Sequence, residues 1–218
     1  MTVLPQRTRI KICGLTREAD LDVAVESGAD AVGFVLYPKS PRAVSLERAA
    51  ELARSLPPFV TPVILLVNAT PAEIDAALAA LPQALIQFHG DETCAACEAP
   101  GRPYLRAARM APGFDLVDFA TRFPSAQAIL LDAHVEGYGG GGKVFDWSLI
   151  PANVPRPVVL SGGLHAGNVI EGILQVRPWA VDVSTGVEAA KGIKDAGLIR
   201  RFCEAVREAD ARIADSET

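Results

Sequence analysis

Asp132 is one residue of this sequence that could do chemistry, because it ends an apolar run and precedes a glycine-rich segment. The run at 129–131 reads ILL and the segment at 137–143 reads GYGGGGK. An apolar run bounded by turn residues is typical of a buried strand, so the carboxylate is expected at the C-terminal end of a strand. Glycines let a backbone approach a ligand and lower the cost of opening and closing. We interpret the segment as a cover over a small site; a surface connection without a role is the alternative.

Two nucleotide-binding motifs overlap the glycine segment, and both fail. Residues 137–142 fit G-x-G-x-x-G, but the acidic residue expected about 20 positions later is absent, since 159–163 read VLSGG. Residues 137–143 also fit G-x-x-x-x-G-K, but Val144 follows where a hydroxyl should bind magnesium. The sequence therefore favours neither a dinucleotide site nor a P-loop.

Cys13 is the second candidate, at the end of the apolar segment 8–13. Alternation along a strand turns Lys11 and Cys13 to one face. In a closed barrel the last strand pairs with the first, which would bring Asp182 near Lys11. We expect the lysine charge to lower the thiol pKa from its free value of about 8.5. A thiolate base and an acid at Asp132 could then move protons on one small substrate; the alternative is a buried cysteine that only packs.

The elements that must position these residues alternate along the whole chain. Strands are predicted at 8–13, 31–36, 61–68, 84–89, 104–109, 127–132, 157–161 and 180–184. Helices are predicted at 17–27 with Thr16 as N-cap, from Ser45 to 55, after Thr70 and Pro71, at 91–98, at 113–122, from 146, at 165–176 and at 195–211.

Eight such units without a linker predict one (β/α)8 barrel over residues 1–218. An open doubly wound sheet would place its glycine turn after the first strand, where residues 13–16 read CGLT.

Two turns at the predicted strand ends have the composition of a phosphate site. Gly162 and Gly163 follow the seventh strand, and Ser184, Thr185 and Gly186 follow the eighth. Backbone N–H groups and hydroxyls in such turns can hold a phosphate without a lysine. Loops after the seventh and eighth strands are where barrels commonly bind phosphate. Ordinary tight turns are the alternative.

Arg42 and His89 complete the candidate site. Arg42 follows Ser40 and Pro41 in a stiffened loop and could make a bidentate contact to a ligand carboxylate. A solvated surface arginine is the alternative. His89 ends the fourth predicted strand, where it would either touch a substrate or make a structural hydrogen bond.

Composition bounds the remaining possibilities. The chain has 218 residues, of which 50% are hydrophobic and 22% charged, with a formal net charge of -5. The absence of a basic cluster argues against nucleic acid. Residues 1–9 lack the apolar core of a signal peptide, and no apolar run reaches the roughly 18 residues of a membrane helix, so a cytoplasmic protein without membrane partners is expected. Cys94 and Cys97 are interpreted as helical neighbours, because nothing completes a zinc site.

Assembled in order, six motifs resemble the phosphoribosylanthranilate isomerase family of tryptophan biosynthesis. They are KICGLT (11–16), GFVLYPKSPR (33–42), QFHGDE (87–92), LLDAHVEGYGGGGKVFDW (130–147), LSGGL (160–164) and VDVSTGVEAAKGIKD (181–195). They span nearly the whole chain.

The resemblance implies an Amadori rearrangement of N-(5′-phosphoribosyl)anthranilate without metal or cofactor. It implies Asp132 as general acid and Cys13 as general base. The substrate-binding residues expected with them are Arg42, His89, Gly141, Gly142, Gly162, Gly163, Asp182, Ser184, Thr185 and Gly186.

Other functions remain open at this point. Another sugar-phosphate barrel, such as the related indole-producing lyase, is one alternative. A pentose-phosphate epimerase would need metal-binding histidines at strand ends, which His134 and His165 do not supply. A barrel that only binds phosphate is a non-enzymatic alternative. The expected partner is a small phosphorylated substrate, and the expected state is a monomer or homodimer.

Overall fold

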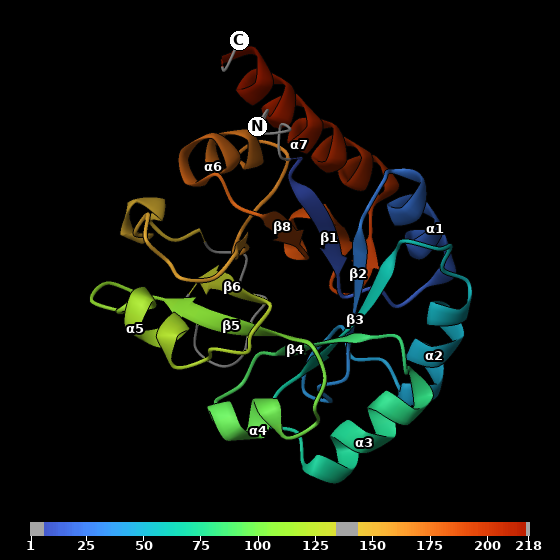
Figure 1. Cartoon of the computed structure of the whole chain (residues 1–218). Helices are drawn as coiled ribbons and strands as arrows, with labels where there is room; N and C mark the ends of the chain where they lie inside the picture. Colours follow the sequence, from blue (N-terminus) through green and yellow to red (C-terminus); the bar gives the residue numbers. More distant parts are fainter. Residues whose placement is uncertain (1–6, 134–143, 217–218) are drawn as a thin grey trace.

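Residues 7–133 and 144–216 are described by the computed structural model, and they contain a closed barrel of eight parallel strands (Figure 1). Each strand pairs with the next, and β8 pairs with β1. The strands are β1 (Arg9–Cys13), β2 (Ala31–Val35), β3 (Thr61–Leu66), β4 (Leu85–Phe88), β5 (Tyr104–Met110), β6 (Ala128–Ala133), β7 (Val158–Leu160) and β8 (Ala180–Val183). The predicted barrel is confirmed.

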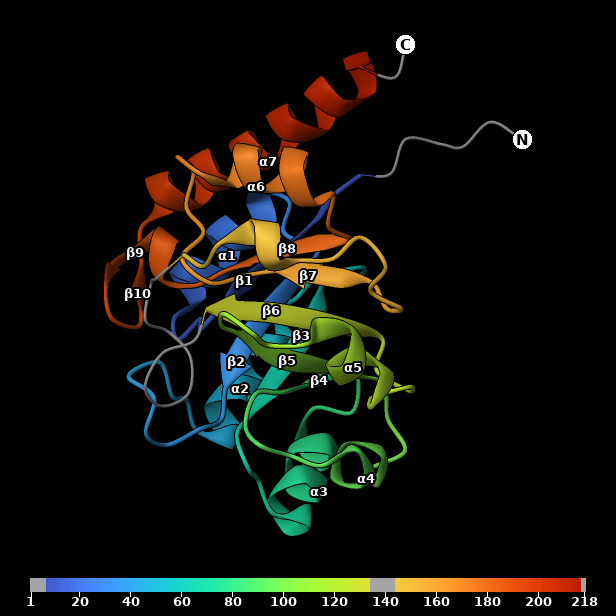
Figure 2. The same cartoon turned by 90° about the vertical axis from the view of Figure 1, so that its left-hand side faces the viewer.

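Helical segments lie outside the strands in both views (Figures 1 and 2). They are α1 (Glu18–Glu26), α2 (Leu46–Arg54), α3 (Pro71–Ala80), α4 (Cys94–Glu98), α5 (Leu116–Thr121), the 3-10 turn η1 (Trp147–Leu149), α6 (Val169–Val176) and α7 (Ala196–Ser216). A second 3-10 turn, η2 (Thr185–Val187), follows β8. Two predicted starts are confirmed by their hydrogen bonds. The Ser45 side chain accepts from the Arg48 N–H, and Thr70 and Glu73 form a capping box.

Two other predicted helix starts are wrong. Helix α1 begins at Glu18 with no side-chain cap, because the Thr16 hydroxyl donates instead to the Gly192 carbonyl at 2.6 Å. Helix α4 begins at Cys94, not at 91, and is capped by Thr93. The Asp91 N–H donates to the Asn68 side chain at 2.7 Å, which draws the chain into a loop contact before the helix begins.

Helices α5 and α6 also begin later than predicted. Asp115 caps α5 by accepting from the Asp118 N–H, so the residues from 113 remain in the loop. Ahead of α6, the Asn168 side chain accepts from the His165 N–H at 2.8 Å and closes a turn. Side-chain acceptors that bond nearby N–H groups compete with the helix in this way.

A small hairpin between β8 and α7 was not predicted. Its strands are β9 (Glu188–Ala190) and β10 (Ile193–Lys194), and they pair antiparallel. Figure 2 places it on the side toward which β6 points, beyond the C-terminal strand ends. Strands this short carry no readable periodicity, so the sequence showed only a loop. Helix α7 extends to Ser216, beyond its predicted end at 211.

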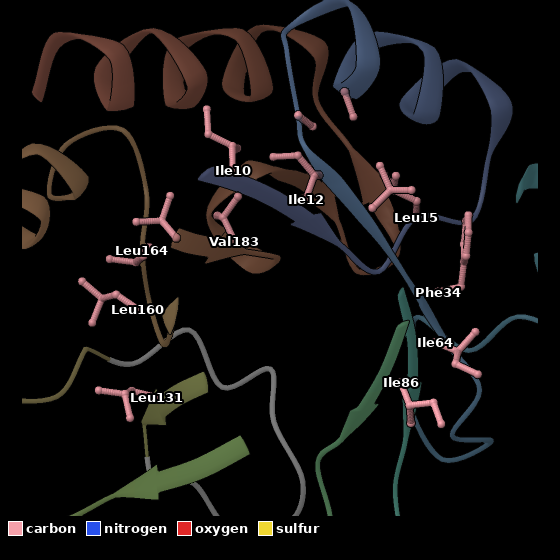
Figure 3. Packing of buried hydrophobic residues seen from close by; sticks show 14 of the residues in the cluster. Ile10, Ile12, Leu15, Phe34, Ile64, Ile86, Leu131, Leu160, Leu164 and Val183 are labelled. Carbon is pink, nitrogen blue, oxygen red and sulfur yellow. The ribbon is translucent and has the colours of Figure 1, made fainter. Parts of the chain in front are cut away.

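Two apolar layers hold the barrel. Side chains that point outward from the strands, such as Ile10, Ile12 and Ile64, pack in one large cluster with the helices (Figure 3). The interior holds a separate, smaller cluster. Its buried members are Val63, Leu105, Ala107, Ala128, Leu130, Val159 and Ala180. Asp132, Ser161 and Asp182 lie two residues beyond Leu130, Val159 and Ala180, so the apolar cluster lies below a mostly polar layer, to which β3 contributes the apolar Leu65.

We predict that Asp210→Ala destabilises the fold by about 2 kcal/mol, because it leaves buried hydrogen-bond donors without an acceptor. The Asp210 carboxylate in α7 accepts from the Thr8 N–H at 3.0 Å and the Thr8 hydroxyl at 2.6 Å, and Thr8 is buried. Urea unfolding measures the change. Glu208→Ala, which removes an exposed pair with Arg212, is the control and should stay within about 0.5 kcal/mol of wild type. Equal effects of the two substitutions would contradict the prediction.

Candidate active site

A cavity of about 400 Å³ lies at the C-terminal ends of the barrel strands. This is within the usual range for small-molecule sites. Inward-facing residues of several strands line it together with the loops that follow β2, β7 and β8. The predicted site residues that line it are Cys13, Arg42, His89, Asp132, Gly162, Gly163, Asp182, Ser184 and Thr185. The barrel therefore brings together side chains that are far apart in the sequence.

Cys13 lies beside a buried ion pair. Lys11 and Asp182 face each other across β1 and β8, and the Lys11 Nζ donates to the Asp182 Oδ1 at 2.7 Å. The Ser161 hydroxyl donates to the other carboxylate oxygen at 3.1 Å. A Cβ on Gly33 would lie 2.6 Å from the Cys13 Sγ, so only glycine on β2 leaves room for the thiol.

The expected lowering of the Cys13 pKa is wrong. Burial raises the pKa of the thiol above its ordinary value, and this exceeds the opposing effect of the Lys11 charge. The Asp182 carboxylate adds to the increase. Burial would lower the pKa of Lys11, but Asp182 and Cys13 together raise it. Burial therefore favours the neutral thiol of Cys13, and Asp182 favours the charged form of Lys11.

Asp132 lies in a chain of side-chain hydrogen bonds. The His89 Nε2 is 3.1 Å from the Asp132 Oδ2, and the His89 Nδ1 is 3.0 Å from the Gln87 Nε2. The Asp132 Oδ1 accepts from the Ala133 N–H at 2.9 Å. Asp132 keeps 13% of its side chain exposed, while His89 keeps 7%. The carboxyl group is thus partly exposed to the cavity, and hydrogen bonds to His89 and Ala133 fix its orientation.

Arg42 is buried, so the alternative of a solvated surface arginine is wrong. Its Nε and Nη2 donate to the two Glu188 oxygens at 2.7 and 2.8 Å. The Lys194 Nζ also donates to Glu188, at 3.0 Å. Hydrogen bonding to Glu188 raises the pKa of Arg42, and the two cations outweigh burial in lowering the pKa of Glu188. A ligand carboxylate would have to use the opposite edge of the guanidinium, at Nη1.

The turns after β7 and β8 pack closely against each other. A Cβ on Gly186 would lie 1.9 Å from the Leu164 carbonyl oxygen, so the close approach requires glycine. Gly186 itself is not among the cavity-lining residues, unlike Ser184 and Thr185. Behind this turn the Lys194 Nζ donates to the Ser184 carbonyl at 3.0 Å and lies 3.3 Å from its hydroxyl. The predicted phosphate turns are adjacent and have a buried lysine next to them.

Several contacts in the candidate site were not predicted from the sequence. Glu188 and Lys194 belong to the hairpin that periodicity could not show, and Gln87 resembles any polar residue in a strand. The one available signal for Gln87 was its position two residues before His89, which turns both side chains toward the cavity.

Other sequence-based expectations have mixed outcomes. Gly141 and Gly142, with the rest of the glycine segment, lie outside the described residues. Within 7–133 and 144–216, no group of three or more His, Cys, Asp or Glu residues could hold a metal ion. Cys94 and Cys97 are both free, and Cys97 is buried in α4. None of the helices in the described ranges combines the length and apolar character that a membrane crossing demands.

Comparisons with known proteins relate the chain to one family. The family model described as N-(5′-phosphoribosyl)anthranilate isomerase matches residues 10–205. An isomerase of that name from Methylibium petroleiphilum is 74% identical, over 97% of this chain and 99% of that protein. The phosphoribosyl anthranilate isomerase structure from Thermotoga maritima is 42% identical with a TM-score of 0.85, covering 92% of this chain and 99% of that one.

A further isomerase structure contains reduced 1-(o-carboxyphenylamino)-1-deoxyribulose 5-phosphate. It is 39% identical with a TM-score of 0.81, and the match covers 92% of this chain and 99% of that one. The match of the family model over most of the chain and the close identity to these isomerases place this enzyme in the N-(5′-phosphoribosyl)anthranilate isomerase family.

Proposed function

We propose that this enzyme converts N-(5′-phosphoribosyl)anthranilate to 1-(2-carboxyphenylamino)-1-deoxyribulose 5-phosphate by a cofactor-free Amadori rearrangement. The observation that carries the proposal is that Cys13 on β1 and Asp132 on β6 line one cavity. An isomerase that moves a proton within its substrate needs an acid and a base in the same site. The related structure that contains the reduced product supports the choice of substrate.

Asp132 is assigned the first proton transfer. Its carboxyl group donates a proton to the ring oxygen of the ribose, the bond from that oxygen to C1′ breaks, and the nitrogen lone pair forms a protonated Schiff base. The aspartate left behind accepts from the Ala133 N–H, with His89 at its other oxygen. A preorganised donor at a developing charge is an effective form of stabilisation.

Cys13 is assigned the second transfer. As thiolate it removes the proton from C2′, and the electron pair moves to the C1′–N unit to give an enolamine. The enolamine tautomerises to the ketone as C1′ gains a proton and the C2′ hydroxyl loses one. Atoms and charge therefore balance without an external oxidant or reductant. Lys11 lies close enough to stabilise the thiolate.

The phosphate and the carboxylate of the substrate are assigned to other groups that line the cavity. The phosphate is assigned to the adjacent turns at Gly162, Gly163, Ser184 and Thr185, and the anthranilate carboxylate to Arg42. Arg42 and Lys194 share the single carboxylate of Glu188, so two cations face one anion and one positive charge remains. This local excess of positive charge favours binding of an anionic ligand, although the formal net charge of the whole chain is -5.

We expect Asp132→Asn to lower kcat by at least about 100-fold with little change in KM, because an amide has no proton to give. The loss of fluorescence of freshly formed phosphoribosylanthranilate is the measurement. Asp118→Asn, on the exposed surface of α5, is the control and should keep full activity. A near-normal kcat would end the assignment of Asp132. Absence of turnover in the folded wild type would leave a barrel that only binds phosphate.

The raised pKa of Cys13 predicts that its thiol reacts slowly with alkylating agents near neutral pH. Only the thiolate reacts with iodoacetamide, so the alkylation rate of Cys13, followed by mass spectrometry of its peptide, should increase nearly tenfold per pH unit from about pH 7 to beyond the free-thiol value of about 8.5. An alkylation rate that levels off below about pH 8 would contradict the raised pKa. Cys13→Ser should lower kcat at least about 100-fold, because a hydroxyl is a much poorer base. Near-normal turnover of Cys13→Ser would show that the thiol is not the base.

Arg42→Lys should raise KM about tenfold and change kcat much less. A carboxylate far from the reacting carbons is bound alike in the ground and transition states, so its loss affects binding alone. Lysine keeps the charge but lacks the planar fork that serves Glu188 and a ligand together. Arg48→Lys on α2 is the matched control. An unchanged KM in Arg42→Lys would place the substrate carboxylate elsewhere.

A further inference from the structure

Gln87 is a buried polar residue for which the proposed mechanism has no use. Its side chain has no exposed surface. Its Nε2 lies 3.0 Å from the His89 Nδ1, while its Oε1 is buried without a hydrogen-bond partner in the described part of the chain. A buried amide oxygen without a partner is costly, so a compensating role for the amide nitrogen is expected.

The backbone around His89 is held independently of Gln87. Arg106 donates through Nη1 to the Phe88 carbonyl and through Nη2 to the Gly90 carbonyl, both at 3.1 Å. The His89 N–H itself donates to the Leu66 carbonyl at 2.9 Å. The backbone on both sides of His89 is therefore fixed without Gln87. The hydrogen-bond partners of the two ring nitrogens then determine which nitrogen carries the proton.

We propose that Gln87 is a positioning residue that holds His89 as the neutral tautomer with its proton on Nε2. An amide nitrogen donates and cannot accept, so Nδ1 must be the acceptor. The ring proton then lies on Nε2 and is donated to the Asp132 Oδ2, 3.1 Å away. The second contact of a histidine commonly selects its tautomer in this way.

The consequence for the reaction rests on the proposed function. Once Asp132 has given up its proton, the Ala133 N–H faces Oδ1 and the His89 Nε2–H faces Oδ2. The other tautomer would turn a nitrogen lone pair toward Oδ2 and repel the new carboxylate. Gln87 thus acts on Asp132 through His89.

The experiment is nitrogen-15 NMR of the histidine rings in the whole protein. The chain has three histidines, and loss of one set of signals in His89→Asn assigns His89. Wild type should show a protonated Nε2 and an unprotonated Nδ1 near pH 7.5. Gln87→Met removes the donor at similar volume, so the ring should sample both tautomers. Gln87→Glu places an acceptor at Nδ1, so the ring should become doubly protonated.

Turnover gives the second readout. We expect Gln87→Met to lower kcat about tenfold with KM within about twofold, as for other residues that orient a catalytic group. Gln127→Met, at an exposed position before β6, is the control and should match wild type. Thermal unfolding confirms that each variant is folded.

Two results would overturn the proposal: a proton on Nδ1 of His89 in wild type, or an unchanged tautomer in Gln87→Met. If wild type fails to consume phosphoribosylanthranilate, the proposed function fails instead. The ring signals still decide the role of Gln87 in that case.

Discussion

The buried ion pair between Lys11 and Asp182 is the constraint on which the site depends. Two charges this deep are tolerated only when they meet with good geometry and their remaining hydrogen bonds are made. Closing β8 onto β1 supplies the first condition, and the Ser161 hydroxyl on the Asp182 carboxylate supplies part of the second. Removing either partner would leave a buried charge and cost about 3–5 kcal/mol. The pairing of β8 with β1 that closes the barrel therefore also places the Lys11 charge beside Cys13.

The interior of the barrel changes character along the strands. Apolar residues fill its lower part, and most of the inward positions above them carry charged or polar groups, such as Asp132 and Asp182. Because inward positions recur every second residue, one strand can contribute to both parts, as β6 does with Leu130 and Asp132 and β8 does with Ala180 and Asp182. The apolar floor excludes water below the site, which strengthens the electrostatic interactions above it. At the Cys13 thiol, the effect of burial on the pKa exceeds that of the neighbouring Lys11 ammonium.

The sequence predicted those features that follow from periodicity. Alternation in β1 and the closure of eight units were enough to expect Lys11 opposite Asp182, and the structure agrees. The pKa of Cys13 was predicted in the wrong direction, because a lysine can be read from the sequence but the depth of burial cannot. The Glu188 contact of Arg42 joins residues 146 positions apart through a hairpin too short to recognise. Such contacts depend on tertiary packing, which local patterns do not encode.

Different interactions govern the two proton-transfer groups. The state of Cys13 reflects burial and charge, since Lys11, Lys194 and Asp182 all act on its pKa. Asp132 is held by hydrogen bonds of fixed direction from His89 and its own neighbouring N–H. Charge acts over several ångströms, whereas hydrogen bonds weaken steeply with angle. A substitution that only changes charge should therefore shift the pKa of Cys13 from several positions around the cavity. A substitution that changes geometry should affect Asp132 through the chain of hydrogen bonds that begins at Gln87, or through the backbone at Ala133.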